Sequence, residues 1–166
     1  MARREGTGRG PQSASITVAM LLMRLFLGGE LLRSGITKWS WLGTETLHTT
    51  LTAWTTGDTP AAYPTYLSFL TTYILPHAPM YTYLVVFGEI IVGAMLILGL
   101  ATRLAALPAL LMSINFLLAT WNKGYEWQLI NESFIVLELG VLIAGAGRYC
   151  GIDSTLAKKH PSLPLW

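Results

Sequence analysis

Four stretches of the chain are almost continuously apolar, and the polar residues gather between them. The stretches cover about residues 15–35, 80–100, 104–121 and 129–146. Each is long enough for a transmembrane helix, since roughly 20 mostly apolar residues cross a hydrocarbon core about 30 Å thick. We therefore predict an all-α integral membrane protein. With four spans, the N-terminus, the second loop and the C-terminus share one side of the membrane.

The connection between the first two spans, residues 39–79, has a weaker and different pattern. Apolar and aromatic residues recur at helical spacing in "TLHTTLTAW" and again in "PTYLSFLTTYIL". We predict two short amphipathic helices in the outer interface, with Trp and Tyr side chains at headgroup level. Two roles stay open for them: a lid over the bundle, or simple packing onto it, which is the more usual case.

The third span follows a connection of only three residues, "ATR", so the second and third helices are expected to be neighbours. Small side chains recur at every fourth position, at Ala101, Ala105, Ala109 and Ser113. Such a ridge permits close approach of another membrane helix. Pro108 removes one backbone donor from this helix and predicts a bend there.

Basic residues are unevenly divided between the two sides that four spans create. Seven lie on the side of the two termini: Arg3, Arg4, Arg9, Arg103, Arg148, Lys158 and Lys159. Three lie on the other side: Arg33, Lys38 and Lys123. The positive-inside rule then places both termini in the cytoplasm, with the chain integral to the cell membrane.

Both ends of the chain are loop-like and are expected to be flexible cytoplasmic tails, residues 1–14 and 157–166, around a membrane domain of residues 15–156. The first span is expected to be retained rather than cleaved as a signal peptide. It is long, it contains Arg24 and Glu30, and no clean small-residue cleavage site follows it.

The composition of the chain supports a membrane protein and argues against nucleic-acid binding and against disulfide chemistry. Hydrophobic residues make up 52% of the chain and charged residues only 12%, about half of the roughly 25% usual in soluble proteins. The formal net charge of +2 gives no reason to expect a nucleic-acid partner. A single cysteine, Cys150, excludes an internal disulfide or a dithiol redox centre within the chain.

Ionisable residues within the spans are the main functional signal. Counting from the cytoplasmic end, Arg24 and Glu138 each lie about nine residues in, and Glu89 and Asn115 about eleven. The count predicts a buried polar layer near the midplane, with Glu89 facing Arg24. Since one arginine cannot easily neutralise two carboxylates, the other carboxyl group is expected to stay protonated or to find a second partner.

A second polar layer is expected nearer the outer face. There Glu30, Arg33 and Ser34 approach the level of Glu132, and Glu30 and Arg33 have the i, i+3 spacing of an ion pair. These charges allow two interpretations. They form a site that binds a ligand or handles protons, or they form a polar clasp that fixes the register of four apolar helices.

Histidine placement argues against a haem or metal site. His48, His77 and His160 all lie outside the predicted spans, so paired imidazole ligands for an intramembrane haem are missing. No Walker, Rossmann or paired Cys/His metal motif occurs in the sequence. We therefore expect no bound metal.

Three segments taken together resemble the DoxX/DoxD family of small four-helix membrane proteins. They are "RLFLGGELLRSGITKW" from Arg24, "GEIIVGAMLILGLATRLAAL" from Gly88 and "GAGRYCGIDSTL" from Gly145. The resemblance covers most of residues 20–156, with the long first loop as variable territory. It implies an antiparallel four-helix bundle related to the membrane subunits of thiosulfate:quinone oxidoreductase, and other members are associated with membrane-linked oxidative-stress complexes.

The resemblance also implies which residues of this chain fall on the family's characteristic positions. They are Arg24, Gly28, Gly35, Lys38, Glu89, Gly93, Gly99, Arg103, Gly147, Arg148 and Asp153. The sequence departs from many members in the third span. Where a histidine is often found, "SINFLLATW" has Asn115, so chemistry that requires this histidine is not expected here.

The resulting hypothesis is a quinone- or lipid-binding subunit of a membrane oxidoreductase. Its catalytic candidates are Glu89, Arg24 and Glu138, and its ligand-binding candidates are Asn115, Glu30, Lys38 and Arg103. The expected cofactor is a non-covalently bound quinone, and the expected partners are membrane lipid and other membrane subunits. The alternative is a non-catalytic accessory subunit of a larger respiratory or photosynthetic complex. A small-molecule carrier ranks last, because four spans leave little room for alternating access.

Overall fold

The protein is helical throughout the residues that the computed structural model describes, 11–56 and 60–160. Most of the predicted N-terminal tail (1–10) and of the predicted C-terminal tail (161–166) lies outside these residues. In chain order the elements are α1 (Pro11–Thr37), η1 (Lys38–Trp41), α2 (Thr46–Thr55), α3 (Pro64–Phe69), η2 (Leu70–Ile74), η3 (Leu75–His77), α4 (Ala78–Leu98), α5 (Thr102–Ala119), η4 (Trp121–Lys123), α6 (Tyr125–Ala144), η5 (Ala146–Arg148) and α7 (Ile152–Lys159).

Four helical segments are long and apolar enough to cross a membrane, as the sequence predicted. They are Ala14–Trp41, Pro64–Leu98, Thr102–Ala119 and Tyr125–Ala144. The second begins earlier than the predicted residue 80, because the π-turn η2 and the 3₁₀ turn η3 join α3 to α4 without a break. The predicted C-terminal tail likewise starts inside α7, which ends at Lys159.

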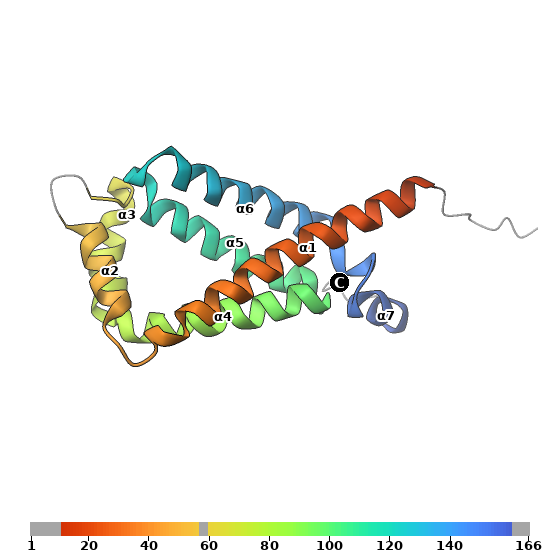
Figure 1. Cartoon of the computed structure of the whole chain (residues 1–166), viewed down its shortest axis with the longest axis horizontal. Helices are drawn as coiled ribbons and strands as arrows, with labels where there is room; N and C mark the ends of the chain where they lie inside the picture. Colours follow the sequence, from red (N-terminus) through yellow and green to blue (C-terminus); the bar gives the residue numbers. More distant parts are fainter. Residues whose placement is uncertain (1–10, 57–59, 161–166) are drawn as a thin grey trace, which may run out of the picture.

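The long helices associate mainly as two pairs, α1 with α4 and α5 with α6 (Figure 1). The short helices α2 and α3 lie across one end of the long helices, and α7 lies at the other end. The N-terminal part of α1 extends past the helices beside it, toward the side of α7. We refer below to the α2/α3 end and the α7 end.

Glycines bring α1 and α4 into close contact. A Cβ atom on Gly28 would lie 2.8 Å from the backbone oxygen of Gly93, and one on Gly35 would lie 2.7 Å from Cγ1 of Ile90. Distances this short leave no room for a side chain, so the two backbones approach closely, as membrane helix pairs favour. The contacts also fix the register: Gly28 lies level with residues 93–97 of α4, and Gly35 with residues 86–90.

The predicted ridge of small residues on α5 is buried. Ala105 and Ala109 are almost fully covered, and Ser113 is 7% exposed. With Leu27, Leu96 and Val141 from the other three long helices, the two alanines belong to the main hydrophobic core. Pro108 lies inside the continuous helix α5.

The turn between α4 and α5 is held by α7. The buried Asp153 side chain accepts hydrogen bonds from the backbone N–H of Ala101 (2.6 Å) and of Thr102 (2.8 Å), the first donors of α5. Its own N–H donates to the carbonyl of Gly99. A carboxylate placed on a helix N-terminus satisfies donors that no helical carbonyl can reach. The C-terminal segment is therefore part of the folded domain.

Candidate functional site

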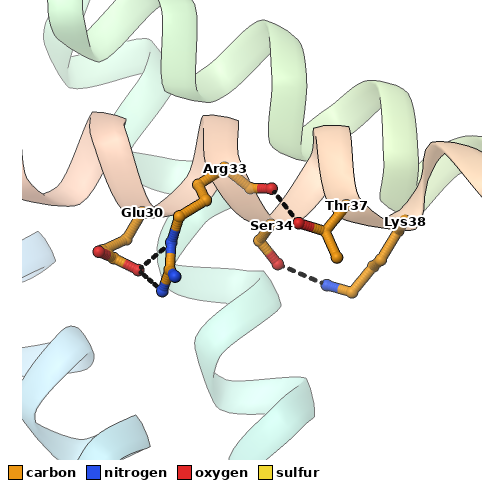
Figure 2. Close-up of polar contacts among 5 residues, drawn as sticks. All are labelled: Glu30, Arg33, Ser34, Thr37 and Lys38. Carbon is orange, nitrogen blue, oxygen red and sulfur yellow. Dashed lines mark hydrogen bonds and ion pairs between the residues drawn. The ribbon is translucent and has the colours of Figure 1, made fainter.

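A buried ion pair joins α1 and α4 inside the apolar spans. Nζ of Lys38 lies 2.5 Å from Oε1 of Glu89, and the side chains are 16% and 2% exposed. Lys38 is the first residue of η1, directly after α1, and its long side chain reaches back along α1 to donate a second hydrogen bond to Oγ of Ser34 (2.8 Å). Figure 2 shows this contact between Ser34 and Lys38. The lysine thus carries its charge from the helix end to the level of Glu89.

Aromatic rings stand beside this ion pair. Nζ of Lys38 lies 5.1 Å from the ring centre of Phe116 on α5 and 6.0 Å from that of Trp41 in η1. Both distances are within the range of cation–π attraction. The site therefore combines a charged pair from α1 and α4 with an apolar wall from α5 and η1. We call Ser34, Lys38, Trp41, Glu89 and Phe116 the Lys38–Glu89 site.

The hydrogen bonds of the site are incomplete. The second carboxylate oxygen of Glu89, Oε2, is buried and has no hydrogen-bond partner among the described residues. An ammonium group has three donors, and two of those of Lys38 are used by Glu89 and Ser34. A buried polar atom without a partner costs about 1–3 kcal/mol. The site can therefore offer an acceptor at Glu89 and a donor at Lys38 to a polar ligand.

The short helix α3 contacts α5 next to this site. The hydroxyl of Tyr66 donates to Oδ1 of Asn115, and Nδ2 of Asn115 donates to the carbonyl of Leu111 (2.6 Å). Asn115 precedes Phe116, so the contact lies one residue from the aromatic wall. A small second core containing Ala62, Leu70 and Ala119 holds the α2/α3 end in place.

Arg24 does not pair with Glu89, contrary to the prediction. Its Nη1 donates to the carbonyl of Ala146 at 3.4 Å, and the guanidinium fits against Gly99 and Gly151, where added Cβ atoms would come within 2.5 and 2.8 Å of Nη1. Arg24 is thus buried at the α7 end of the molecule, level with the last residue of α4. Fourteen residues separate it from Lys38 on α1, which corresponds to about 21 Å.

The misplacement of Arg24 has a physical cause. The predicted depth was counted from the start of the apolar run near Ser15, but α1 extends beyond α4 at the α7 end (Figure 1). The residues that precede Arg24 lie in this extension rather than beside the other helices. Depth is therefore better measured from the contacts between α1 and α4 than from the onset of hydrophobicity.

Glu138 is the second buried carboxyl group. It accepts a hydrogen bond from Oγ of Ser113 (2.9 Å), and its other oxygen is buried without a partner in the described part of the chain. Met112, beside Ser113, lies next to Gly88, which places Glu138 at about the depth of Glu89. Among the residues described, no cation forms a salt bridge with Glu138.

The predicted pair of Glu30 and Arg33 is formed. Nη2 of Arg33 lies 2.6 Å from Oε2 of Glu30, with a second contact from Nε at 3.2 Å. Figure 2 shows this pair and the contact between Ser34 and Lys38 on the same side of α1. The pair is exposed, however, and among the residues described neither side chain hydrogen-bonds to a residue of the Lys38–Glu89 site.

Arg103 lies away from the Lys38–Glu89 site. It fits against Gly145 at the end of α6 and donates to the carbonyl of Ile143 at 3.4 Å. A cation at a helix C-terminus is stabilised by the unpaired carbonyl groups there.

Within the described part of the chain, no group of three or more His, Cys, Asp or Glu residues is arranged to hold a metal ion.

Comparison with known proteins identifies the family. A family model described as "TQO small subunit DoxD" matches residues 20–164, which include almost all of the four apolar segments. TQO denotes thiosulfate:quinone oxidoreductase. No solved structure matches the chain. The chain is therefore a membrane protein that belongs to the DoxD family.

Proposed function

We propose that the Lys38–Glu89 site holds the polar head of a membrane quinone, and that the chain acts as a membrane subunit of a thiosulfate:quinone type of oxidoreductase. The observation that carries the proposal is the buried Oε2 of Glu89, which has no partner among the described residues although a charged lysine lies beside it. A ligand with both a donor and an acceptor would complete this site. Quinones and quinols have both kinds of group and partition into the bilayer.

Each residue has a distinct role in this proposal. Lys38 donates a hydrogen bond to a carbonyl oxygen of the head group, and Oε2 of Glu89 accepts a proton from a hydroxyl group. Phe116 and Trp41 supply the flat apolar walls on which a quinone ring rests. When bound, the quinone itself supplies the redox chemistry, since it takes up electrons together with protons.

Glu138 and Asn115 have supporting roles. Glu138 lies near the depth of Glu89, and Ser113 orients it on the α5/α6 side, where it would exchange protons with the site. Asn115 is held by Tyr66, and together they close the site toward the α2/α3 end. Arg24 and Arg103 have structural roles at the α7 end in this proposal, because Arg24 donates to Ala146 in η5 and Arg103 donates to Ile143 near the end of α6.

In the membrane, we infer a four-helix arrangement with both termini in the cytoplasm and with α2 and α3 in the outer interface. The distribution of basic residues supports this orientation. Aromatic residues at the α2/α3 end support the interfacial position. Nζ of Lys123 lies 4.4 Å from the ring centres of both Trp54 and Trp127, which ties α2 to the start of α6 at headgroup level. The Lys38–Glu89 site would then open toward the outer leaflet.

The test is quinone binding by the purified protein in detergent or nanodiscs, followed by the quenching of tryptophan fluorescence. Short-chain ubiquinone and menaquinone analogues serve as probes. We expect Lys38→Met and Glu89→Gln each to weaken binding by about tenfold or more, because a hydrogen bond to a charged group contributes about 1.5–3 kcal/mol. Lys158→Met and Glu132→Gln change exposed residues of the same types and are the matched controls.

A second candidate function is supported by the position of the same ion pair. Lys38 and Glu89 connect α1 to α4, so a purely structural clasp in an accessory subunit is the competing interpretation. In that case Glu89→Gln would lower thermal stability, and neither quinone analogue would bind to the wild-type protein. Displacement of a bound phospholipid, with no response to either quinone, would instead identify a lipid site.

A further inference from the structure

An exposed ion pair on a membrane-spanning helix requires a polar neighbour. The side chains of Glu30 and Arg33 are 34% and 76% exposed, and they contact each other at 2.6 Å. Both belong to the apolar segment Ala14–Trp41. Figure 2 shows them projecting from one side of α1. The Lys38–Glu89 site does not use this pair.

The ion pair lies well inside the span rather than at its end. The glycine contacts place Gly28 level with residues 93–97 of α4 and Gly35 level with residues 86–90. By the same register, Glu30 and Arg33 lie level with residues 90–93, near the middle of the 21-residue α4. A charged side chain at such depth costs at least about 2.5 kcal/mol if it faces lipid. This surface is therefore expected to be covered by polar groups from outside the chain.

Gly29, beside this ion pair, gives a second and independent indication. A Cβ atom at Gly29 would meet nothing within 4 Å, whereas one at Gly28, Gly35 or Gly93 would collide with the facing helix. Glycine inside a helix costs roughly 0.5–1 kcal/mol relative to alanine. No contact within the described part of the chain explains that cost at Gly29. A missing side chain on an exposed face does, however, allow another helix to approach closely.

We propose that this face of α1 binds the same face of a second copy of the chain. Its central residues are Gly29, Glu30 and Arg33, flanked by the exposed side chain of Leu22. The ion pair carries both signs and no net charge, so it is complementary to itself. A two-fold axis along the membrane normal would place Glu30 of each copy opposite Arg33 of the other.

The geometry of insertion fits this symmetry. All copies insert in the same orientation, so two α1 helices related by this axis run parallel, and equal residues meet at equal depth. Gly29 would face Gly29 of the partner copy at the closest approach. Arg33 already extends back by almost one turn to the level of Glu30, so the same reach serves a glutamate on the partner helix.

Cysteine crosslinking tests the proposed interface, because Cys150 is the only cysteine in the chain. In a Cys150→Ser background, Gly29→Cys is expected to form a disulfide-linked dimer in native membranes under mild oxidation. The matched control is Ile91→Cys, which lies at similar depth on an exposed face of α4. At least about tenfold more dimer from Gly29→Cys is expected. Equal crosslinking of the two variants would overturn the proposal.

Two charge-reversal variants, tested singly and together, distinguish a second copy of the chain from any other partner. Glu30→Lys and Arg33→Glu should each weaken self-association by about tenfold or more, since like charges facing each other cost several kcal/mol. Coexpression of the two variants with different affinity tags should restore association as a mixed dimer. A mixed dimer would also show that both variants are folded. If the mixture associates no better than the single variants, or if the wild-type protein is crosslinked only to a different protein, the second-copy proposal is wrong.

Discussion

At the scale of single residues, the partner of Glu89 depends on how far a side chain extends and not on the depth of its Cα atom. Lys38 directly follows α1, yet its ammonium group lies at Glu89, near the middle of α4. Counting residues along the sequence puts Arg24 near the midplane, but contacts with Gly99 and Ala146 place it at the α7 end. The partner of Glu89 was therefore not predictable from depth.

The spacing of Ser34 and Lys38 does indicate one contact of the site, the one between these two side chains. Residues at i and i+4 share a helix face, and a lysine side chain leans toward the N-terminus of its helix. The family resemblance marked Lys38 as a candidate, but only the observed register of α1 against α4 brings it to Glu89. The burial of Glu89 and Glu138, by contrast, followed from their positions within apolar runs.

A prediction at this scale concerns the α1–α4 contact. Gly93→Ala should reduce the free energy of unfolding by about 1–3 kcal/mol, because overpacking at a tight contact costs that much. Its Cβ atom would lie 2.6 Å from the backbone nitrogen of Leu32. Thermal unfolding in detergent, followed by circular dichroism, measures the effect.

Gly88→Ala is the control for that measurement. Its added Cβ atom would meet only Sδ of Met112, at an ordinary 3.8 Å. The variant should be as stable as the wild-type protein. Equal stability of the two alanine variants would show that the close approach of α1 and α4 does not depend on Gly93.

At the scale of elements, the hydrophobic periodicity of the sequence predicts the helices but not how they are connected. Periodicity predicted both short helices of the long loop and all four spans, and the structure has helices in each place. It did not predict that α3 continues into α4 through η2 and η3, since the π and 3₁₀ turns leave the apolar pattern unbroken. It also missed α7 as an integral part of the fold, because Asp153 acts through backbone donors far away in the sequence.

A prediction at this scale concerns the contact between α3 and α5. Tyr66→Phe removes the hydroxyl that donates to Asn115 while keeping the ring in the small second core. We expect faster amide hydrogen exchange over residues 64–74, because a local opening of α3 loses one of its fixing contacts. Exchange within α6 should not change.

Tyr63→Phe provides the comparison for this experiment. Tyr63 packs edge-on against Trp121, and no side-chain hydrogen bond to its hydroxyl is observed among the residues described. This variant should exchange like the wild-type protein. Should both variants accelerate exchange equally, the Tyr66–Asn115 hydrogen bond would not be what holds α3 in place.

At the scale of the whole molecule, the two ends differ in chemistry, and the proposed orientation in the membrane is based on that difference. The α7 end has buried Arg24 and Asp153 together with the exposed Arg148, Lys158 and Lys159. The α2/α3 end has Trp54 beside Lys123 and Tyr63 packed against Trp121. In the proposed orientation, these aromatic side chains lie at the outer membrane interface.

The orientation can be tested with thiol labelling. Cys150 is exposed at the α7 end, so a membrane-impermeant maleimide should label it in inside-out vesicles and not in intact cells. Thr49→Cys in a Cys150→Ser background places the thiol on an exposed position of α2 and should show the opposite pattern. Labelling of Cys150 in intact cells would reverse the proposed orientation.

The most direct measurement of the central claim is photolabelling with an azidoquinone, followed by peptide mapping. If the Lys38–Glu89 site holds the quinone head, the label should fall on the segments that contain Lys38 to Trp41 and Phe116, which form its walls. An excess of unlabelled quinone should abolish the labelling, and Glu89→Gln should reduce it. Labelling that falls elsewhere on the chain, or that competing quinone leaves unchanged, would contradict the account.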